Sequence, residues 1–141
     1  MTSVTQLTVV IPNAPGNLAK MTDLLRAAHV NISALSMMET GQQCKVHLIL
    51  DDVETAKITL KMSYAVTAKE VLAFHIRNAP GAIASIGRAC AGAGVNIQTL
   101  YSTATGKEAM VYVVVDDLGK AKEAVARWKK TSGADFSLEG K

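Results

Sequence analysis

Two short apolar runs, Thr5–Ile11 and Val71–Ile76, are rich in strand-forming residues and end beside a proline or an asparagine. After each run, apolar residues recur every three or four positions, as on one face of a helix. They are Leu18, Met21, Leu24, Leu25 and Ala28 in the first case and Ile83, Ile86, Cys90 and Ala93 in the second. The pattern therefore predicts a strand followed by a helix at two places.

The remaining segments extend this order in both places. Further strands are expected at residues 30–38, 45–50, 64–68, 95–102, 109–115 and 134–138. Helices are expected near residues 53–62 and 118–130, where Asp52 and Asp117 occupy the N-cap positions.

The resulting order is strand, helix, strand, strand, helix, strand, and it occurs twice. This is the α+β ferredoxin-like arrangement, in which a four-stranded antiparallel sheet carries two helices on one face. We therefore expect two ferredoxin-like βαββαβ units in tandem, residues 1–69 and 70–141. No segment rich in Ser, Gly or Pro separates them, so they could cover each other's sheets or join edges into one longer sheet.

The two halves are copies of one sequence. Asn-Ala-Pro-Gly at residues 13–16 recurs at residues 78–81, and Val-Asn-Ile at residues 30–32 recurs at residues 95–97. Residues 13–52 and 78–117 align without gaps and are identical at about 15 of 40 positions. Repetition of this extent indicates a duplication.

Composition narrows the classes of function. The net charge is +3, and among the basic residues of the last third Trp128 is a single aromatic residue rather than an aromatic platform, which favours a solvated helix face over a nucleic-acid surface. Tyr112 is the only aromatic residue on the predicted third strands, so base stacking with RNA is not expected. The chain starts without a signal-like segment and has no apolar stretch long enough for a membrane span. Cys44 and Cys90 are typical of reduced thiols, so we expect a cytoplasmic protein with no nucleic-acid or membrane partner.

No arrangement of catalytic or metal-binding residues is recognisable. Cys44 and His47 stand three residues apart on a predicted strand, and an odd spacing directs side chains to opposite faces. Cys90 falls on the apolar stripe of a helix, where packing explains it. The aspartate pairs 51–52 and 116–117 stand at helix starts, where capping explains them. We therefore expect no catalytic residue, no metal site, no cofactor and no enzyme activity.

The strand-to-helix corner that occurs in both halves is the candidate binding site. Amide groups at a helix start suit a carboxylate, and proline suits a first helical turn because it has no N–H to lose. Gly16 and Gly81 have no Cβ, so a ligand can approach the backbone closely. The repeated asparagines supply donors and acceptors, both of which an α-amino acid needs. The corner therefore predicts a site for a free amino acid.

Residues 11–32 (IPNAPGNLAKMTDLLRAAHVNI) and 76–97 (IRNAPGAIASIGRACAGAGVNI) resemble the ACT domain. The shared signature is a strand, N-x-P-G, a helix and Val-Asn-Ile, and the resemblance covers nearly the whole chain as a tandem pair. It implies a non-catalytic, allosteric regulator that binds an amino acid at the interface between paired ACT domains. It also implies a homodimer and a partner among the enzymes of amino-acid metabolism or the transporters.

Carried over by position, the ligand contacts come from the corner of one domain and from the second-strand asparagine of its partner. The corner residues are Asn13, Ala14, Gly16, Asn17 and Leu18 in the first half and Asn78, Ala79, Gly81, Ala82 and Ile83 in the second half. The residues of the partner domain are Asn31, Ile32, Asn96 and Ile97. A pseudo-twofold pairing would place Asn13 opposite Asn96 and Asn78 opposite Asn31.

Two departures from the family pattern bear on the ligand. Ile11 and Ile76 stand where serine-binding ACT domains carry a histidine, so serine recognition is not implied. His29 replaces the usual glycine, which indicates a distorted or empty first site. The expected pocket walls are Leu18, Met37, Ile83 and Tyr101. Walls of this kind favour an aliphatic or aromatic ligand side chain.

Two other functions compete with this interpretation. A detached assembly subunit of an amino-acid metabolic enzyme would keep the regulatory role without binding a ligand of its own. A small enzyme on this fold would need a cluster of polar residues, and the sequence presents none.

Overall fold

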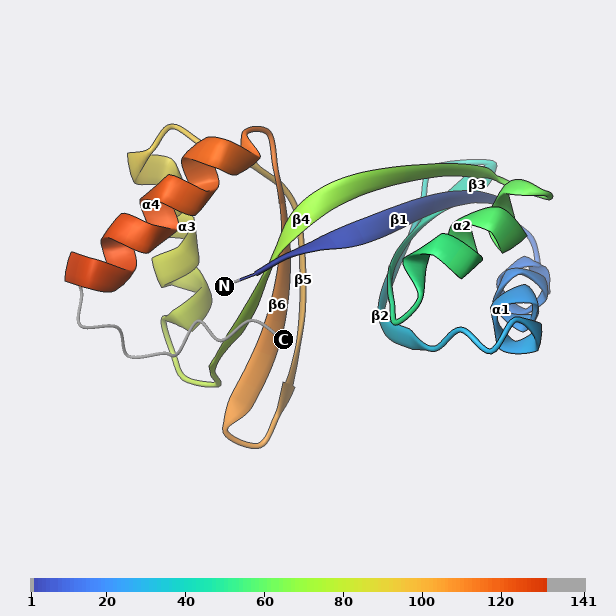
Figure 1. Ribbon diagram of the computed structural model, residues 1–141, viewed down its shortest axis with the longest axis horizontal. Helices are drawn as coiled ribbons and strands as arrows, with labels where there is room; N and C mark the ends of the chain where they lie inside the picture. The colour runs from blue at the N-terminus through green and yellow to red at the C-terminus, as the bar shows by residue number, and fades with distance from the viewer. Residues whose placement is uncertain (1, 132–141) are drawn as a thin grey trace. The chain divides into compact units, whose positions relative to one another are not determined.

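The computed structural model describes residues 2–131, with side chains as far as residue 127. Figure 1 shows the elements in chain order. The strands are β1 (Thr2–Pro12), β2 (Ile32–Glu39), β3 (Gln43–Leu50), β4 (Ala65–Arg77), β5 (Ile97–Thr105) and β6 (Glu108–Val115). The helices are α1 (Asn17–Ala27), α2 (Val53–Lys61), α3 (Ala82–Gly92) and α4 (Leu118–Thr131). The predicted α+β class and order of elements are confirmed, and the strand expected at residues 134–138 lies outside the described residues.

The sheet differs from the expected four strands per unit. Its strand order is β2-β3-β1-β4-β6-β5, so six strands follow one another through hydrogen bonds. The strands expected at residues 64–68 and 71–76 are one continuous strand, the 13-residue β4. No glycine or proline interrupts this segment, so the ladder can continue through the polar pair Lys69-Glu70. β4 therefore provides both the last strand of the first half and the first strand of the second half.

Contacts between Cα atoms divide the chain into two units. The first unit holds residues 5–69, and the second holds residues 70–131 together with residues 2–4. In the first unit, β3 pairs antiparallel with β1 and with β2. In the second unit, β6 pairs antiparallel with β4 and with β5. The same pairing scheme thus occurs in both copies.

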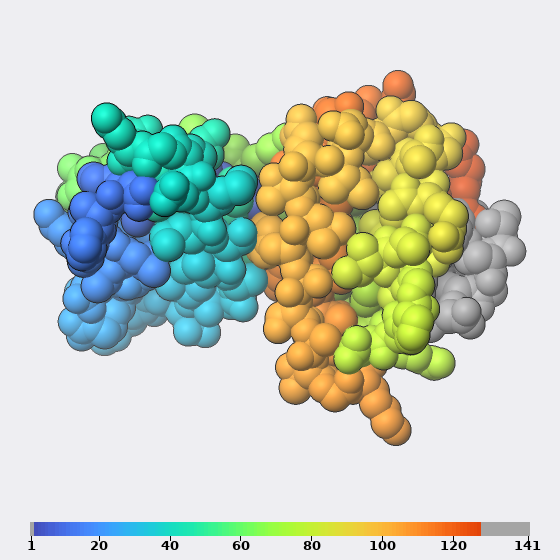
Figure 2. All heavy atoms as spheres, turned by 180° about the vertical axis from the view of Figure 1, so that it is seen from behind, coloured from blue at the N-terminus to red at the C-terminus, as the bar shows by residue number. Residues whose placement is uncertain are grey.

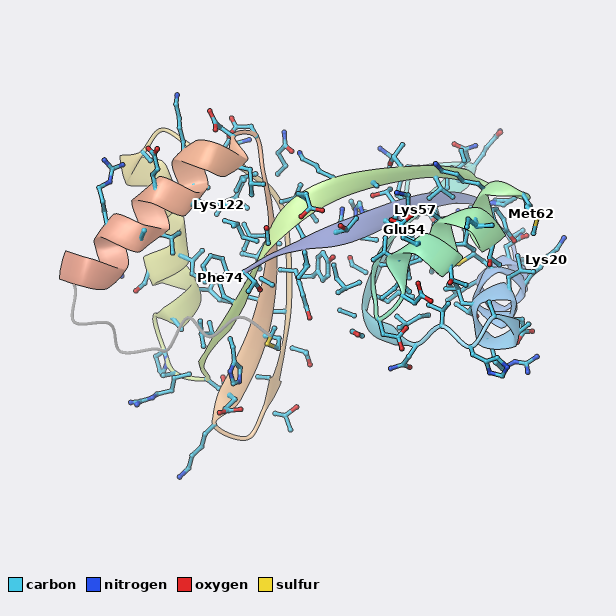
Figure 3. All side chains as sticks on the ribbon, viewed as in Figure 1. Lys20, Glu54, Lys57, Met62, Phe74 and Lys122 are labelled. Carbon is cyan, nitrogen blue, oxygen red and sulfur yellow. The ribbon has the colours of Figure 1, made fainter. Side chains whose placement is uncertain are left out.

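The core of the second unit lies between its strands and its two helices. Leu72, Phe74 and Ile76 alternate along β4, and their side chains cluster with Ile86 of α3 and Val125 of α4. Phe74, labelled in Figure 3, is fully buried between β4 and these helices. Because residues on both helices contact the same alternating strand positions, both helices cover one face of the sheet. Each of these large apolar side chains contributes about 1.5–3 kcal/mol through burial.

The first unit has an equivalent core. It is formed by alternating residues of β1 and β3 with residues of both helices, and all of these residues are buried. Its members are Leu7, Val9, Ile11, Met21, Leu25, Val30, Cys44, Val46, Leu48, Leu50, Ala56 and Leu60. Cys44 therefore packs in an apolar core, as Cys90 does in the second unit.

The helix ends agree with the sequence pattern. Asp52 caps α2, because its carboxylate accepts hydrogen bonds from the Thr55 amide at 3.1 Å and the Thr55 hydroxyl at 2.7 Å. After α1 and α3, the chain turns through left-handed residues, His29 with φ 58° and Gly94 with φ 69°. Glycine adopts this conformation without a steric penalty and histidine does not, as expected for the two copies.

Candidate functional site

Both halves turn from strand to helix through Asn-Ala-Pro-Gly. We call residues 13–18 the first corner and residues 78–83 the second corner. The residue before each helix is a left-handed glycine, Gly16 with φ 88° and Gly81 with φ 89°. The prolines lie in the turn before the helix rather than in its first turn, because α1 and α3 begin two residues after them.

Each corner is fastened to the hairpin between the second and third strands of its unit. The side-chain amide of Asn78 donates to the backbone oxygen of Gly106 at 2.9 Å, and the Asn78 backbone amide donates to Lys107. In Figure 2, the yellow-green corner lies at the surface beside the orange hairpin. Asn13 bonds to Gly41 at the same distance. The repeated asparagines thus have a structural role, and one of the two amide hydrogens of each is already engaged.

The starts of α1 and α3 have open amide groups. Within the described part of the chain, the backbone amides of Leu18, Ala19, Ile83 and Ala84 have no hydrogen-bond partner. Neither helix has an acidic residue in its first turn or a side-chain cap. An uncapped helix start of this kind attracts an anion through its N–H groups and its dipole.

The other two helices are capped by their own carboxylates. Asp52 caps α2, and the Asp117 carboxylate accepts a hydrogen bond from the Lys120 amide at 3.0 Å at the start of α4. The preceding aspartates, Asp51 and Asp116, bind a different group. Each carboxylate accepts a hydrogen bond, at 2.9 Å, from the backbone amide of the asparagine that precedes β2 or β5. Among the four described helices, α1 and α3 are therefore the two that start without a carboxylate cap.

An open cleft of about 250 Å³, the strand-side cleft, adjoins the second corner. It is lined by Ile76, Arg77, Asn78, Ala79, Gly81, Ala82, Ile83, Ala84, Ser102, Ala104 and Ala109. In the sheet, Ala109 pairs with Ile76 on one side and with Ala104 on the other. The small side chains of Ala104 and Ala109 form the floor of the cleft, on the face of the sheet that the helices cover. The cleft brings together the predicted corner residues of the second half with the end of β5.

A second open cleft of about 460 Å³, the arginine cleft, lies at the same corner. It is lined by Arg77, Ala79, Pro80, Gly81, Ala82, Ser85 and Arg88. Its volume falls within the range of small-molecule sites. The two clefts share Arg77, Ala79, Gly81 and Ala82, so they adjoin each other.

The corresponding positions of the first half carry residues of different size or charge, including Lys20 in place of Ser85. Ser102, Ala104 and Ala109 correspond to Met37, Glu39 and Cys44, and Arg77 and Arg88 correspond to Pro12 and Asp23. The first corner therefore has the same backbone and a different chemical surrounding.

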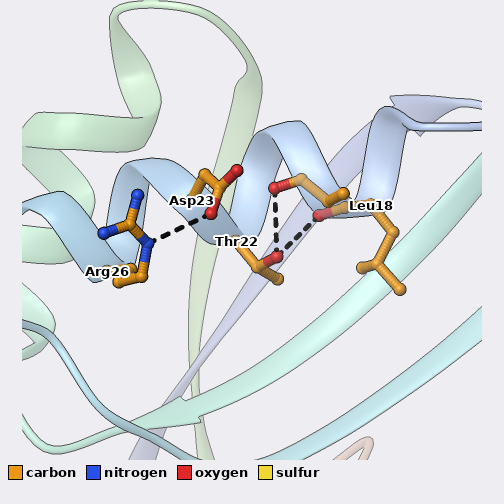
Figure 4. A network of polar contacts seen from close by, with 5 residues as sticks. Leu18, Thr22, Asp23 and Arg26 are labelled. Atoms are coloured by element: carbon orange, nitrogen blue, oxygen red, sulfur yellow. Dashed lines mark hydrogen bonds and ion pairs between the residues drawn. The ribbon is translucent and has the colours of Figure 1, made fainter.

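Asp23 of the first half is paired within its own helix. Its carboxylate lies 3.2 Å from Nε of Arg26, and a dashed line marks this ion pair in Figure 4. Thr22 lies beside it, and its hydroxyl donates to the backbone oxygens of Leu18 and Ala19.

The expected pocket walls are only partly found at the second corner. Ile83 lines the strand-side cleft. Tyr101 lies on the opposite face of the sheet, where its ring stacks on Tyr112 with centroids 5.4 Å apart. Burial raises the pKa of the Tyr101 hydroxyl, and the Tyr112 phenol adds to this shift. The wall predicted at Tyr101 is therefore wrong for this cleft.

Asn31 and Asn96 lie far from the corners of their own units. At the far end of β3, the Asn31 backbone amide donates to the Asp51 carboxylate and the Asp51 backbone amide donates to the Asn31 carbonyl, whereas the first corner adjoins the near end of β3 at Gln43. About seven residues of extended strand, roughly 23 Å, separate these ends. Ile32 and Ile97 begin β2 and β5 beside these asparagines and are half-buried. The distance means that a corner and its own second-strand asparagine cannot contact one small ligand.

Other polar groups form pairs rather than reaction centres. The Thr8 hydroxyl lies 3.0 Å from Nδ1 of His47, and burial together with the Lys45 charge lowers the pKa of His47. Cys44 is in the core whereas its neighbour His47 is not, in agreement with strand parity. Among the described residues, no three His, Cys, Asp or Glu side chains group as metal ligands would, and no helix is long and apolar enough to cross a bilayer.

Sequence reasoning did not predict four residues that line the clefts beside the second corner, namely Arg77, Arg88, Ser102 and Ala104. Comparing the charges of the two halves would have singled out the arginines, because position 77 corresponds to Pro12 and position 88 to Asp23. The small residues of β5 follow only from the strand register.

Comparison with known proteins places the chain in a family. A solved protein of Bacteroides thetaiotaomicron, BT0572, shares 28% identity and superposes with a TM-score of 0.85 over 90% of this chain and 89% of its own. The regulatory subunit of aspartate kinase from Thermus thermophilus has the same fold, with 15% identity and a TM-score of 0.66 over 91% of this chain and 97% of its own. The regulatory subunit of aspartate kinase from Thermus flavus also has this fold, with 19% identity and a TM-score of 0.61 over 89% of this chain and 92% of its own. No curated protein matches the sequence. The sequence model of the ACT domain pair family matches residues 1–138, and the chain therefore belongs to this family.

Proposed function

We propose that this ACT domain pair is a non-catalytic regulatory protein that binds a free amino acid at a strand-to-helix corner. The observation that carries the proposal is the open start of α3, where the amides of Ile83 and Ala84 have no partner among residues 2–131 and the strand-side cleft adjoins them. The second corner is the stronger of the two sites, because small side chains leave room there.

The proposed contacts use complementary groups of an α-amino acid. The ligand carboxylate accepts hydrogen bonds from the amides at the start of α3, where the helix dipole also favours a negative charge. The side-chain oxygen of Asn78, which has no partner among the described residues, accepts a hydrogen bond from the ligand ammonium group. Gly81 allows close approach, because nothing lies within 4 Å of a Cβ built on it.

A second copy of the chain completes the site in this proposal. β2 and β5 are the terminal strands of the sheet, and their only charged residue is Glu39 at the end of β2. Uncharged edge strands are templates for pairing. Antiparallel pairing of an edge strand with the same strand of another copy brings Asn31 or Asn96 of that copy towards the corner. We therefore expect a homodimer, with twice the mass of one chain in analytical ultracentrifugation.

The proposed regulatory partner is an enzyme of amino-acid metabolism. Two proteins of the same fold are regulatory subunits of aspartate kinase, which supports this partner class as an analogy at the level of the fold. In this proposal the protein regulates its partner by binding the ligand more tightly in one conformation of the assembly than in another. An assembly subunit that binds no ligand is the competing function.

Thermal denaturation in the presence of each of the twenty amino acids tests the proposal. A ligand at 100 times its dissociation constant stabilises the native state by about 2.7 kcal/mol, which raises the melting temperature of a chain of this size by several degrees. We expect one or a few amino acids to have this effect. The proposal is refuted if none of them does, and the assembly-subunit function then stands.

A pair of variants locates the binding site. Gly81→Ala places a methyl group in the second corner, and Gly94→Ala places one just after the end of α3. The two glycines are matched, because both have a left-handed backbone and nothing lies within 4 Å of a Cβ built on either. Both lose about 1 kcal/mol of stability through backbone strain. Only Gly81→Ala should lose the response to the ligand, and equal responses in both variants would contradict the proposed site.

A further inference from the structure

Two arginines at the second corner have no acidic partner. Arg77 ends β4 and Arg88 lies on α3, and both are exposed. Among the described residues, neither guanidinium is within 4.0 Å of a carboxylate, and the only hydrogen bond of the two is from Arg88 Nη2 to the Ser85 hydroxyl at 3.3 Å. Glu108 pairs with Arg77 across the strands, but its carboxylate contacts His75 Nε2 at 2.9 Å instead. The corner therefore carries two arginines without an ion-pair partner among the described residues.

Both arginines line one cleft. Arg77 and Arg88 come from different elements and line the same arginine cleft with Ser85 and Gly81. The hydrogen bond to Ser85 holds the Arg88 side chain towards the start of α3, because Ser85 is one turn nearer that end. The arginine cleft shares Arg77 and the corner backbone with the strand-side cleft, so one small ligand can reach both clefts.

The duplication shows that the fold does not require these arginines. The first corner has the same glycine conformation and the same asparagine-to-hairpin bond, with Pro12 and Asp23 at the equivalent positions. Glu39 adds a further negative charge where the second half has Ala104. A structural need would apply to both copies, so the positive charges of the second corner call for another explanation.

We propose that the second corner binds an amino acid with a second carboxylate, and that Arg77 and Arg88 recognise this side-chain carboxylate. The inference rests on the proposed function and names the ligand class of the same site. The α-carboxylate faces the amides of Ile83 and Ala84 in the strand-side cleft, and the second carboxylate reaches the arginine cleft. Guanidinium groups bind carboxylates through charge-assisted, often bidentate hydrogen bonds.

This ligand class differs from the apolar one that the sequence predicts. That expectation depends on Tyr101 and on large apolar walls, whereas Tyr101 is on the other face of the sheet and Ser102, Ala104 and Ala109 form the floor. Of the two wall residues expected in the second half, only Ile83 lines this cleft, so part of the predicted apolar wall is missing. Two unpaired arginines favour a ligand of net negative charge over its neutral isostere.

Isothermal titration of the full chain at low ionic strength tests the inference with matched ligands. L-aspartate and L-glutamate are compared with L-asparagine and L-glutamine, which have the same shape without the second charge. Succinate and glutarate test whether the ammonium group is needed. We expect at least one acidic amino acid to bind at least 10-fold more tightly than its amide and than the matching plain dicarboxylate.

Variants identify the residues that recognise the charge. Arg77→Gln and Arg88→Gln should each weaken binding of the acidic amino acid about 10-fold and leave binding of its amide unchanged. Arg26→Gln is the control, because Arg26 is an equally exposed arginine on α1 that already pairs with Asp23.

Each alternative result has a definite meaning. Tighter or equal binding of a neutral amino acid, lost in Gly81→Ala, overturns the inference and leaves the proposed function intact. Equal binding of the plain dicarboxylate also overturns it, because the ligand is then not an amino acid. If no amino acid binds, both the inference and the proposed function fail.

Discussion

The side chain of Asn78 is hydrogen-bonded to the backbone oxygen of Gly106, and Asn13 is bonded to Gly41 in the same way 65 residues earlier. In both copies the donor is Nδ2 and the distance is 2.9 Å. The asparagine before Pro-Gly therefore fixes the position of the corner relative to the hairpin. Any ligand at the second corner meets a surface whose shape depends on this bond.

Replacing Asn78 should lower both stability and ligand binding. Asn78→Ala removes one hydrogen bond, which we expect to cost about 1 kcal/mol in the free energy of unfolding measured with urea. Ligand affinity should fall as well, because the variant also lacks the side-chain oxygen that accepts the ammonium group.

The control for this variant is Asn96→Ala. Asn96 is equally exposed, and its side chain makes no hydrogen bond within the described residues. Its replacement should change the unfolding free energy by less than about 0.5 kcal/mol. Equal destabilisation by the two variants would show that the bond to Gly106 contributes nothing to stability.

The left-handed residue after α1 offers a gain in stability. His29 has φ 58°, where a side chain costs about 1 kcal/mol relative to glycine. His29→Gly should therefore raise the unfolding free energy by about 1 kcal/mol in urea titrations. The reciprocal variant Gly94→His, at φ 69°, should lower it by a similar amount. A loss of stability in His29→Gly would indicate that the imidazole makes a compensating interaction.

The capping aspartate of α2 should make stability depend on pH. The hydrogen bonds from the hydroxyl and the backbone amide of Thr55 hold the pKa of Asp52 below its usual value, against a small opposing effect of burial. A carboxyl group whose pKa is lower in the folded state contributes its stabilisation fully above the unfolded pKa, near 4, and loses it as the pH falls through the folded pKa. The stability difference between wild type and Asp52→Asn should therefore be constant above about pH 5 and shrink below about pH 4.

Urea unfolding at a series of pH values between 7 and 2.5 measures this difference. Thr55→Val, which lacks the hydroxyl donor, serves as the control and should show a weaker dependence on pH than wild type in the same range. A gap between wild type and Asp52→Asn that stays unchanged down to pH 2.5 would contradict the role of the cap.

Local sequence patterns predicted most helices and strands well, because helical spacing and N-capping depend on residues only three or four positions apart. Helical spacing of apolar residues and the aspartate caps indicate where each helix lies. Because the chain is a duplication, the elements predicted in one half could be compared with those predicted in the other. The boundary between the two predicted units falls between Lys69 and Glu70, yet both residues continue β4. Polar residues are compatible with a strand whenever the neighbouring strands provide hydrogen bonds, and a local pattern does not reveal those neighbours.

A β-bulge explains why the pocket walls were harder to predict. Strict alternation from Ile97, which packs on the core, would place Tyr101 on the same face. The register shifts between Ile97 and Thr99, so Leu100 packs on the core and Tyr101 points to the other face. Sequence spacing alone contains no sign of that extra residue. The pairing of Asn78 with Gly106 escaped prediction for a related reason, since it joins residues 28 positions apart.

The difference between the two corners leads to a last prediction, that each chain binds one amino acid. Gly16 and Gly81 form a matched pair, because their φ angles are 88° and 89° and nothing lies within 4 Å of a Cβ built on either. Alanine at each position therefore imposes the same backbone strain, and both variants should melt at similar temperatures. The surroundings differ, since the first corner has Glu39, Lys20 and an Asp23 that is paired with Arg26, whereas Arg77 and Arg88 line the arginine cleft at the second corner.

An amino-acid carboxylate should therefore bind the second corner alone. Isothermal titration should give about one ligand per chain for wild type and for Gly16→Ala, and no measurable binding for Gly81→Ala. Two equivalent ligands per chain, or loss of binding in Gly16→Ala, would mean that the charges around the corners do not decide occupancy. Because strain is equal in the two variants, a difference between them can only reflect what each corner contacts.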